Sequence, residues 1–361
     1  VDVMRWMYAM QNPEHNLLFG YSIGNEIRKK LIQLWNSYSF FATYASVDGY
    51  DPYKNKVNYI DFSIMDKWII SKLNVFIRDC NSSLEQFRSD IMMRKFDLFL
   101  DDLSNWYIRR SRRRFWKSED DLDKQTAYQV LYECLTTVIK LISPVLPFIT
   151  EEIYQNLVKN IGSDEHESIH LCDYPSSDLK KIDIELMKNI DSLRRVVELG
   201  RSARNKAKIK IRQPLSELHF HVTDKKVANF ILSESKIIED ELNVKKVVQA
   251  DSEDKLVKFN IKPNLPILGA KYGKNLKIIS EAIRKITPDK IISKIRSDKK
   301  LDLLIQSKEI SIFRDELIFE QESAEKFSSS GDDNHTVGLL VDINEDLKKE
   351  GIARDAIRQV Q

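Results

Sequence analysis

The chain has 361 residues, more than one compact core usually holds, so two or three domains are predicted. Its content of 42% hydrophobic and 31% charged residues is typical of a soluble globular protein, and no apolar run or leading segment has the form of a membrane span or a signal sequence. The net charge is only +2, so any affinity for nucleic acid must come from local clusters of basic residues.

The cysteines Cys80, Cys134 and Cys172 lie far apart in the sequence. This spacing argues against a disulfide framework and against a zinc site, whose ligands come in close pairs. We therefore expect reduced thiols and no bound metal.

Apolar residues recur at helical spacing through the first 160 residues, and short polar connections separate the periodic segments. A short helix and a loop occupy 1–24, and Asn25 is a plausible N-cap for the next helix. A helical bundle is expected. Its helices are predicted at 25–44, 63–81, 84–116, 123–142 and 148–160.

Residues 101–116 stand out because they hold five arginines in six positions, Arg109 to Arg114 with Ser111 between them. The preceding apolar stripe of Phe96, Leu100, Leu103 and Tyr107 should face a core. Helical geometry places Trp106, Arg109, Arg112 and Arg113 on a different flank. Guanidinium groups bind phosphate and an indole can stack on a base, so this flank is a candidate RNA-binding surface.

Other readings of the same residues stay open. The arginines could form a solvated charge run paired with Asp97, Asp101, Asp102 or the acidic segment 119–121, and Trp106 could belong partly to the core. In an uninterrupted helix Arg110 and Arg114 turn back towards the apolar stripe. These two arginines are better candidates for structural ion pairs than for RNA contacts.

A second basic segment follows a predicted helix at 178–206. Residues 208–212 alternate basic and apolar side chains, which predicts an extended stretch with one cationic face. This face could contact RNA, or its charges could protect a sheet edge from pairing. The candidate contact residues are Arg201, Arg204, Lys206, Lys208, Lys210 and Arg212.

Beyond Pro214 the sequence predicts an α+β region with a loop at 263–273 and a mobile stretch at 325–334. Thr287 and Asn344 are expected to precede and cap two of its helices. Strands are predicted near 218–222, 244–249, 255–261, 301–305, 317–320 and 337–343, and helices within 224–242, 275–286, 288–295 and after 344.

Catalytic signatures are not found in this sequence. It has neither common glycine-rich phosphate loop, and no serine or cysteine nucleophile with a matching histidine can be argued. His219 and His221 project from one face of a predicted strand, but no cysteine or dense group of carboxylates accompanies them, so a solvent-facing role is favoured over metal binding.

Several motifs together resemble the anticodon-binding helical bundle of class I isoleucyl-tRNA synthetases, most closely the branch found in eukaryotes, archaea and some bacteria. The resemblance covers nearly the whole chain. Its motifs are Leu-Trp-Asn-Ser-Tyr-Ser-Phe-Phe at 34–41 with Asp-Gly at 48–49, Asn-Trp-Tyr-Ile-Arg-Arg-Ser-Arg-Arg-Arg-Phe-Trp at 105–116, and Ser-Pro-Val-Leu-Pro-Phe at 143–148 with Thr-Glu-Glu at 150–152. Residues 203–206, 211–215, 264–273 and 350–354 look like the segments that follow the bundle in this family.

The resemblance implies a mainly α fold: the end of a connector at 1–24, an anticodon-binding helical bundle at 25–175, a basic junction at 176–215 and a smaller, truncated α+β C-terminal domain at 216–361. It implies binding of tRNA(Ile) in the cytoplasm by part of a monomeric ligase that uses ATP with Mg²⁺. The two ATP-site signatures, the editing domain and the zinc-binding tail of one bacterial branch are absent from this sequence. Catalysis would therefore belong to a missing preceding part, and the fragment alone should be inactive and hold no cofactor.

Three alternatives remain at this level. The bundle could belong to a valyl, leucyl or methionyl relative, or to a freestanding tRNA-binding module. The start at Val1, which reads as a helix already under way, argues against the module. The chain could also be a non-catalytic helical scaffold that binds proteins rather than RNA.

Overall fold

The computed structural model describes all residues except 13, 55, 118–120, 163–164, 306–307, 325 and 361. The chain divides into two compact units, Val1–Met187 and Lys188–Gln361. The boundary falls inside the segment predicted as a basic junction. Each unit has its own core and is described by itself.

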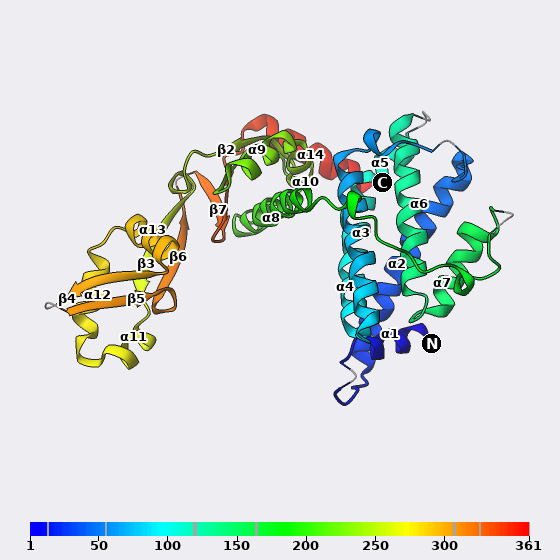
Figure 1. Ribbon diagram of the computed structural model, residues 1–361. Helices are drawn as coiled ribbons and strands as arrows, with labels where there is room; N and C mark the ends of the chain where they lie inside the picture. Colours follow the sequence, from blue (N-terminus) through cyan, green and yellow to red (C-terminus); the bar gives the residue numbers. More distant parts are fainter. Residues whose placement is uncertain are drawn as a thin grey trace. The chain divides into compact units, whose positions relative to one another are not determined.

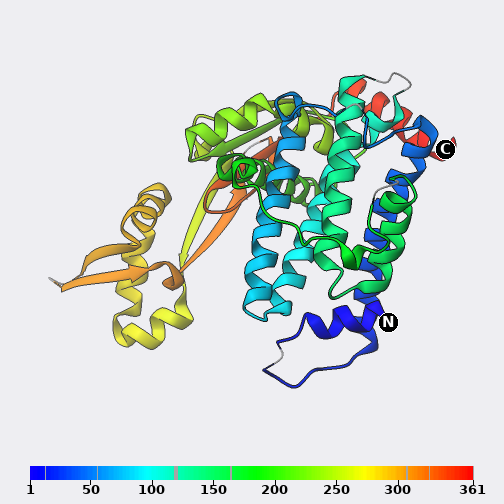
Figure 2. The ribbon, with the colours of Figure 1, turned by 45° about the vertical axis from the view of Figure 1, so that its right-hand side comes forward.

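The first unit is a helical bundle in which α3, α4 and α6 lie side by side (Figures 1 and 2). The elements of the bundle are α1 (Asp2–Ala9), α2 (Tyr21–Asp48), α3 (Ile64–Glu85), α4 (Ser89–Asp101), a π-helical segment (Asp102–Ile108), α5 (Arg109–Trp116), α6 (Leu122–Ile142) and α7 (Pro147–Tyr154), which a second π-helical segment (Gln155–Lys159) extends. The predicted bundle is confirmed. Each of the five predicted helices has a counterpart.

Local chemistry explains several ends of these helices. Ser63 caps α3 by a reciprocal capping box with Asp66. Gly49 ends α2 in the left-handed conformation, with φ of 63°. The N-cap predicted at Asn25 is wrong, because α2 already begins at Tyr21. The helix predicted from Leu84 is also interrupted, since a turn with Phe87 at φ of 57° separates α3 from α4.

The second unit contains a four-stranded mixed sheet in the order β2-β1-β8-β7. Strand β1 (Leu215–Val222) pairs parallel with β2 (Val244–Gln249) and antiparallel with β8 (His335–Leu340), which pairs antiparallel with β7 (Phe327–Gly331). Helix α8 (Ile184–Lys206) begins at the end of the first unit. The remaining helices of this part are α9 (Lys225–Ser233), α10 (Ser235–Leu242) and α14 (Glu345–Val360).

Two antiparallel strand pairs and three helices surround a further core in the second unit. Strand β3 (Val257–Pro263) pairs with β6 (Leu317–Ser323), and β4 (Lys300–Ile305) pairs with β5 (Lys308–Phe313) (Figure 1). The helices α11 (Leu265–Tyr272), α12 (Leu276–Arg284) and α13 (Pro288–Asp298) contribute Leu268, Ile279 and Ile291 to this core. The predicted α+β character is therefore confirmed.

Details of this region differ from the predictions. The loop expected at 263–273 is mostly α11, because Pro266 lies in the first turn, where a missing N–H is tolerated. The mobile stretch expected at 325–334 contains β7, and its serines are buried: Ser328 donates to Ala203 O at 2.7 Å and Ser329 to Leu256 O at 2.7 Å. Strand β5 was not predicted. The helix starts expected after Thr287 and Asn344 are confirmed.

Candidate nucleic-acid interface

The arginine row lies on a continuous helical path made of α4, the π-helical segment and α5. The apolar stripe predicted to anchor it is confirmed, since Phe96, Leu100, Leu103 and Tyr107 are all 0% exposed. Residues 101–116 are thus held against the bundle by one face. The opposite face is available to solvent.

Three of the five arginines project from that face: Arg109, Arg112 and Arg113 are exposed. The guanidinium of Arg109 lies 6.0 Å from the centre of the Trp106 ring, and its Nε donates to Asn105 O at 2.8 Å. The guanidinium of Arg112 lies 5.9 Å from the ring centre of Phe40. Within the described part of the chain, neither Arg112 nor Arg113 forms an ion pair, so both charges are available to an anion.

Trp106 is only 8% exposed. A nucleobase therefore cannot stack on its face unless the side chain leaves its packed position. Trp116, at the end of α5, is 57% exposed and offers an open ring close in sequence to the arginines. Our sequence reasoning did not select Trp116, although an aromatic residue directly after the arginine row was a visible signal.

Arg114 has the structural role that its position predicted. Its Nη1 and Nη2 donate to Oδ1 and Oδ2 of Asp66 at 2.7 and 2.9 Å, and Nη2 also donates to Asp123 O at 2.9 Å. Tyr107 donates to Asp66 Oδ1 at 2.6 Å. The carboxylate is fully buried, so the guanidinium neutralises a charge that would otherwise be costly in the core.

The acidic residues proposed as partners for the arginines have other contacts. Lys30 lies 2.8 Å from Asp97 and 3.3 Å from Asp101, and Lys72 lies 3.6 Å from Asp102. The predicted partners at 119 and 120 lie outside the described residues. Asp121 accepts from Lys117 at 3.3 Å. Much of the nearby negative charge is therefore neutralised by lysines.

The pairing of Asp66 predicts a pH dependence of stability. Burial raises the pKa of Asp66, but the hydrogen bonds and charge of Arg114 outweigh this and hold the pKa below its ordinary value. A carboxyl whose pKa is lower in the folded state than in the unfolded state stabilises the fold above an unfolded pKa of about 4. That stability is lost as the pH falls through the folded-state pKa.

We therefore expect the free energy of unfolding of the chain to exceed that of Asp66→Asn at pH 7, and the difference to shrink steadily below about pH 4. Urea unfolding followed by circular dichroism at pH 7, 5, 4 and 3 measures it. A difference that stays constant down to pH 3 would contradict the assigned role of the carboxylate.

The second basic segment does not form the predicted extended cationic face. Residues 207–213 make a sequence of turns after α8, and Lys208 adopts φ of 56°. Arg204, which was predicted to contact RNA, is instead buried, with its side chain 2% exposed. It donates four hydrogen bonds to the carbonyls of Lys210, Gln213, Leu242 and Asn243.

The other basic residues of this segment remain at the surface in different environments. Lys208 and Lys210 are exposed. Arg201 lies 2.5 Å from Glu241, Lys206 donates to Ser329 O at 3.0 Å, and Arg212 lies 3.0 Å from Asp355. Among the described residues, Lys208 and Lys210 have no ion pair or side-chain hydrogen bond, whereas the other three basic groups are partly engaged. The end of α8 and the turns therefore carry no continuous cationic row.

The two histidines of β1 have local partners. His219 lies 2.7 Å from Glu217, and His221 Nδ1 lies 3.3 Å from Ala250 O. The described residues include no cluster of three or more side chains suited to hold a metal, and none of the described helices is long and apolar enough to cross a membrane. Cys80, Cys134 and Cys172 are free thiols.

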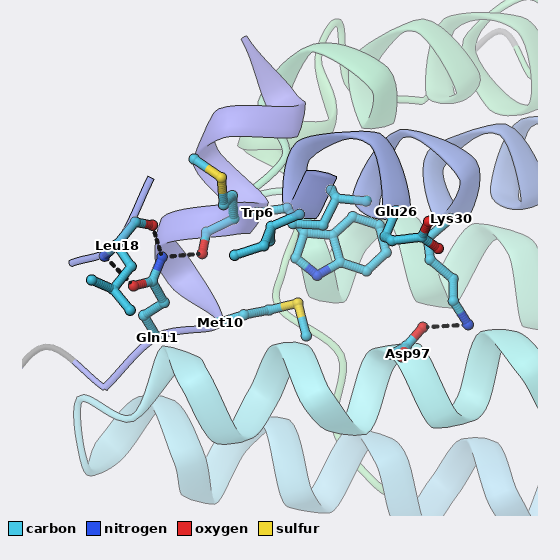
Figure 3. Close-up of a pocket in the computed structure, with 10 residues that line it drawn as sticks. Trp6, Met10, Gln11, Leu18, Glu26, Lys30 and Asp97 are labelled. Carbon is cyan, nitrogen blue, oxygen red and sulfur yellow. Dashed lines mark hydrogen bonds and ion pairs between the residues drawn. The ribbon is translucent and has the colours of Figure 1, made fainter. Parts of the chain in front are cut away.

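An apolar pocket of about 340 Å³ lies in the first unit between α1, α2 and α4 (Figure 3). Trp6 and Met10 line it, and the ion pair of Lys30 with Asp97 lies on the α2 and α4 side. Gln11 closes the neighbouring loop by bonding Leu18 N and O at 2.6 and 2.8 Å. None of the arginines of the row lines this pocket.

Comparison with known proteins assigns the arginine row to a domain type. Residues 66–219 match the family described as "Anticodon-binding domain of tRNA ligase". Over its full length the chain is 38% identical to an isoleucine–tRNA ligase of Clostridium tetani, 37% identical to one of Clostridium kluyveri and 34% identical to one of Thermus thermophilus. It spans about a third of these relatives, 34%, 34% and 35% of their lengths respectively. Over its whole length the chain is thus similar to about a third of each of these isoleucine–tRNA ligases, and its residues 66–219 resemble an anticodon-binding domain.

Proposed function

We propose that this chain is the tRNA-recognition part of an isoleucine–tRNA ligase and that it binds the anticodon region of tRNA(Ile). The observation that carries the proposal is the exposed row of Arg109, Arg112 and Arg113 on a helix inside the matched domain. Single-stranded loops expose base edges and phosphates that such a surface can contact. The identity of the relatives supports isoleucine as the amino acid.

In this proposal the attachment of isoleucine, with ATP and Mg²⁺, is carried out by other parts of a longer, monomeric cytoplasmic enzyme. The chain itself contributes affinity and discrimination between tRNAs. Lys208 and Lys210 would hold backbone phosphates and so set the position of the tRNA without reading its sequence.

We expect the 361-residue chain to shift a tRNA(Ile) transcript in a native gel, and an anticodon-swapped transcript to bind more weakly. If about five phosphates are neutralised, log Kd should rise with log salt concentration with a slope of about 3.5 to 4.5. Equal affinity for both transcripts would assign the contacts to the backbone alone. No binding at low salt would refute the proposal.

The same experiment separates the related ligases. Transcripts of valine, leucine and methionine tRNAs are compared, each with its native anticodon and with the isoleucine anticodon. The comparison tests whether the anticodon or another part of the tRNA determines the binding affinity. We expect transplanting the isoleucine anticodon to strengthen binding. A preference for one of the other native tRNAs over tRNA(Ile) would assign the chain to that specificity instead.

A further inference from the structure

The π-helical segment Asp102–Ile108 directly precedes the arginine row. Such a segment closes its hydrogen bonds one residue later than an α-helix and so accommodates an extra residue. Because an α-helix turns by about 100° per residue, the residues after it are rotated by about one residue step relative to an uninterrupted helix.

The burial pattern shows this rotation. Continuing the stripe that ends at Leu103 and Tyr107 with α-helical spacing would bring Arg110 and Arg114 to its centre. The structure instead buries Ser111, at 4% exposure, and Phe115, at 2%. The rotation therefore moves a small and an aromatic side chain into the core, and leaves Arg112 and Arg113 on the outer face.

One carboxylate joins the two ends of the rotated stretch. Asp66 Oδ1 accepts from Tyr107 Oη at 2.6 Å, inside the π-helical segment, and from Arg114 Nη1 at 2.7 Å, two turns later. Asp66 itself is fixed on α3, because Ser63 N and Oγ donate to its Oδ2 at 3.0 and 2.6 Å. The exposed arginines lie between these two contacts.

Phe115 adds an apolar contact at the end of the same stretch. Its ring meets Phe40 and Tyr128 edge-on, with centre distances of 5.1 and 4.9 Å. This packing opposes movement of α5, and the directional bonds from Tyr107 and Arg114 to Asp66 oppose its rotation about the helix axis. Rotation would change which arginines face outward.

We propose that Asp66 is a positioning residue for RNA recognition, which bonds Tyr107 and Arg114 at once and thereby holds the rotated arginine row facing the RNA. The inference rests on the proposed function. Asp66 is buried and RNA cannot reach it. Its proposed role in tRNA affinity is separate from its contribution to the stability of the fold.

Asp90 offers a matched control. It is also a fully buried carboxylate of the bundle, and it accepts from Nε and Nη2 of Arg88 at 2.8 and 2.9 Å. It lies in the first turn of α4, before the apolar stripe. The arginine that pairs with Asp90 is 39% exposed, against 14% for Arg114. Asp90→Asn therefore removes the charge of an equally inaccessible carboxylate, in a less buried ion pair, without releasing the arginine row.

The test compares tRNA(Ile) binding by the chain, Asp66→Asn and Asp90→Asn at a temperature where circular dichroism shows all three folded. We expect Asp66→Asn to raise Kd about tenfold or more and to lower the salt slope by about 1 to 2, because arginine contacts to phosphate are lost. Asp90→Asn should change Kd less than about twofold and leave the slope unchanged.

Tyr107→Phe provides a second variant if Asp66→Asn does not fold. It removes one hydrogen bond and no charge, and we expect it to raise Kd about threefold. The positioning role would be overturned if the parent chain binds tRNA and the folded Asp66→Asn variant has the same Kd and salt slope. The same outcome for Tyr107→Phe would overturn it if Asp66→Asn does not fold. Equal losses in the Asp66 and Asp90 variants would overturn it as well. A chain that binds no tRNA would instead refute the proposed function.

Discussion

Replacing Arg112 and Arg113 together by glutamate should weaken tRNA binding by about 100-fold or more, which corresponds to about 2.7 kcal/mol. Both side chains are exposed, and within the described part of the chain neither is neutralised by an ion pair. The double variant loses two guanidinium contacts with phosphate and adds two negative charges that repel the RNA backbone. Native gel shifts at several salt concentrations measure the Kd and its slope.

The matched control for this prediction is the double variant Arg28→Glu and Lys29→Glu. These residues are adjacent, exposed and basic and lie on α2. Replacing both by glutamate changes the net charge by the same amount as replacing Arg112 and Arg113. We expect less than about a fivefold change in Kd, since only the long-range field is altered. Similar losses in both double variants would mean that net charge, and not the arginine row, decides affinity. An unchanged Kd in the Arg112 and Arg113 variant would favour a protein-binding scaffold.

Arg204→Met should lower the free energy of unfolding of the second unit by about 3 to 5 kcal/mol. The side chain is 2% exposed, and its four hydrogen bonds have lengths of 2.6 to 3.1 Å. Methionine matches much of the volume but leaves four carbonyls without their donor. Burial lowers the pKa of Arg204 to about 10, so the guanidinium is still charged at neutral pH.

Urea unfolding followed by fluorescence and circular dichroism tests this prediction, with Arg195→Met as the control. Arg195 lies on the same helix, but its side chain is 44% exposed and its partners are Glu198 and Asp332 at the surface. Removing such a pair should cost less than about 1 kcal/mol. A loss at Arg204 no larger than that at Arg195 would show that the turns 207–213 keep their conformation without the guanidinium.

Some arginines of this chain are exposed and available to RNA, whereas others stabilise the fold by binding buried groups. Arginines close in sequence can differ in this respect. Arg113 and Arg114 are adjacent, yet one is exposed and the other holds a buried aspartate. Arg204 and Lys208 belong to the same basic segment, yet one bonds only backbone carbonyls and the other is exposed. If each basic residue were replaced and only tRNA binding were measured, a lost RNA contact could not be told from a loss of stability.

The helices of the bundle could be predicted from the sequence because their signals are local. The apolar spacing of Phe96, Leu100, Leu103 and Tyr107 follows the helical period, and all four are buried. The same holds for the proline at the start of α13 and for the cap at Asn344. The motifs around the arginine row were also sufficient to indicate the resemblance to an anticodon-binding domain.

The errors occurred where contacts distant in sequence determine the structure. The polar stretch around Ser328 reads as mobile, but it forms a strand that pairs with β8. The hydroxyls of Ser328 and Ser329 donate hydrogen bonds to the backbone carbonyls of residues 203 and 256. The alternating segment 208–212 reads as a strand, but it lies in turns, and the guanidinium of Arg204 donates to the carbonyls of Lys210 and Gln213 there. Neither partner can be identified from the spacing of residues.

For this protein, then, periodicity and short motifs determined the bundle, its inward face and its likeness to an anticodon-binding domain, because each depends on residues within one or two helical turns. Helical spacing also placed Arg109, Arg112 and Arg113 outward. What holds this face in place was decided only by the tertiary structure. It depends on the extra residue of the π-helical segment and on Asp66, which reaches Tyr107 and Arg114 from a separate helix. A carboxylate 41 and 48 positions away along the chain leaves no local signal in the helix that it orients.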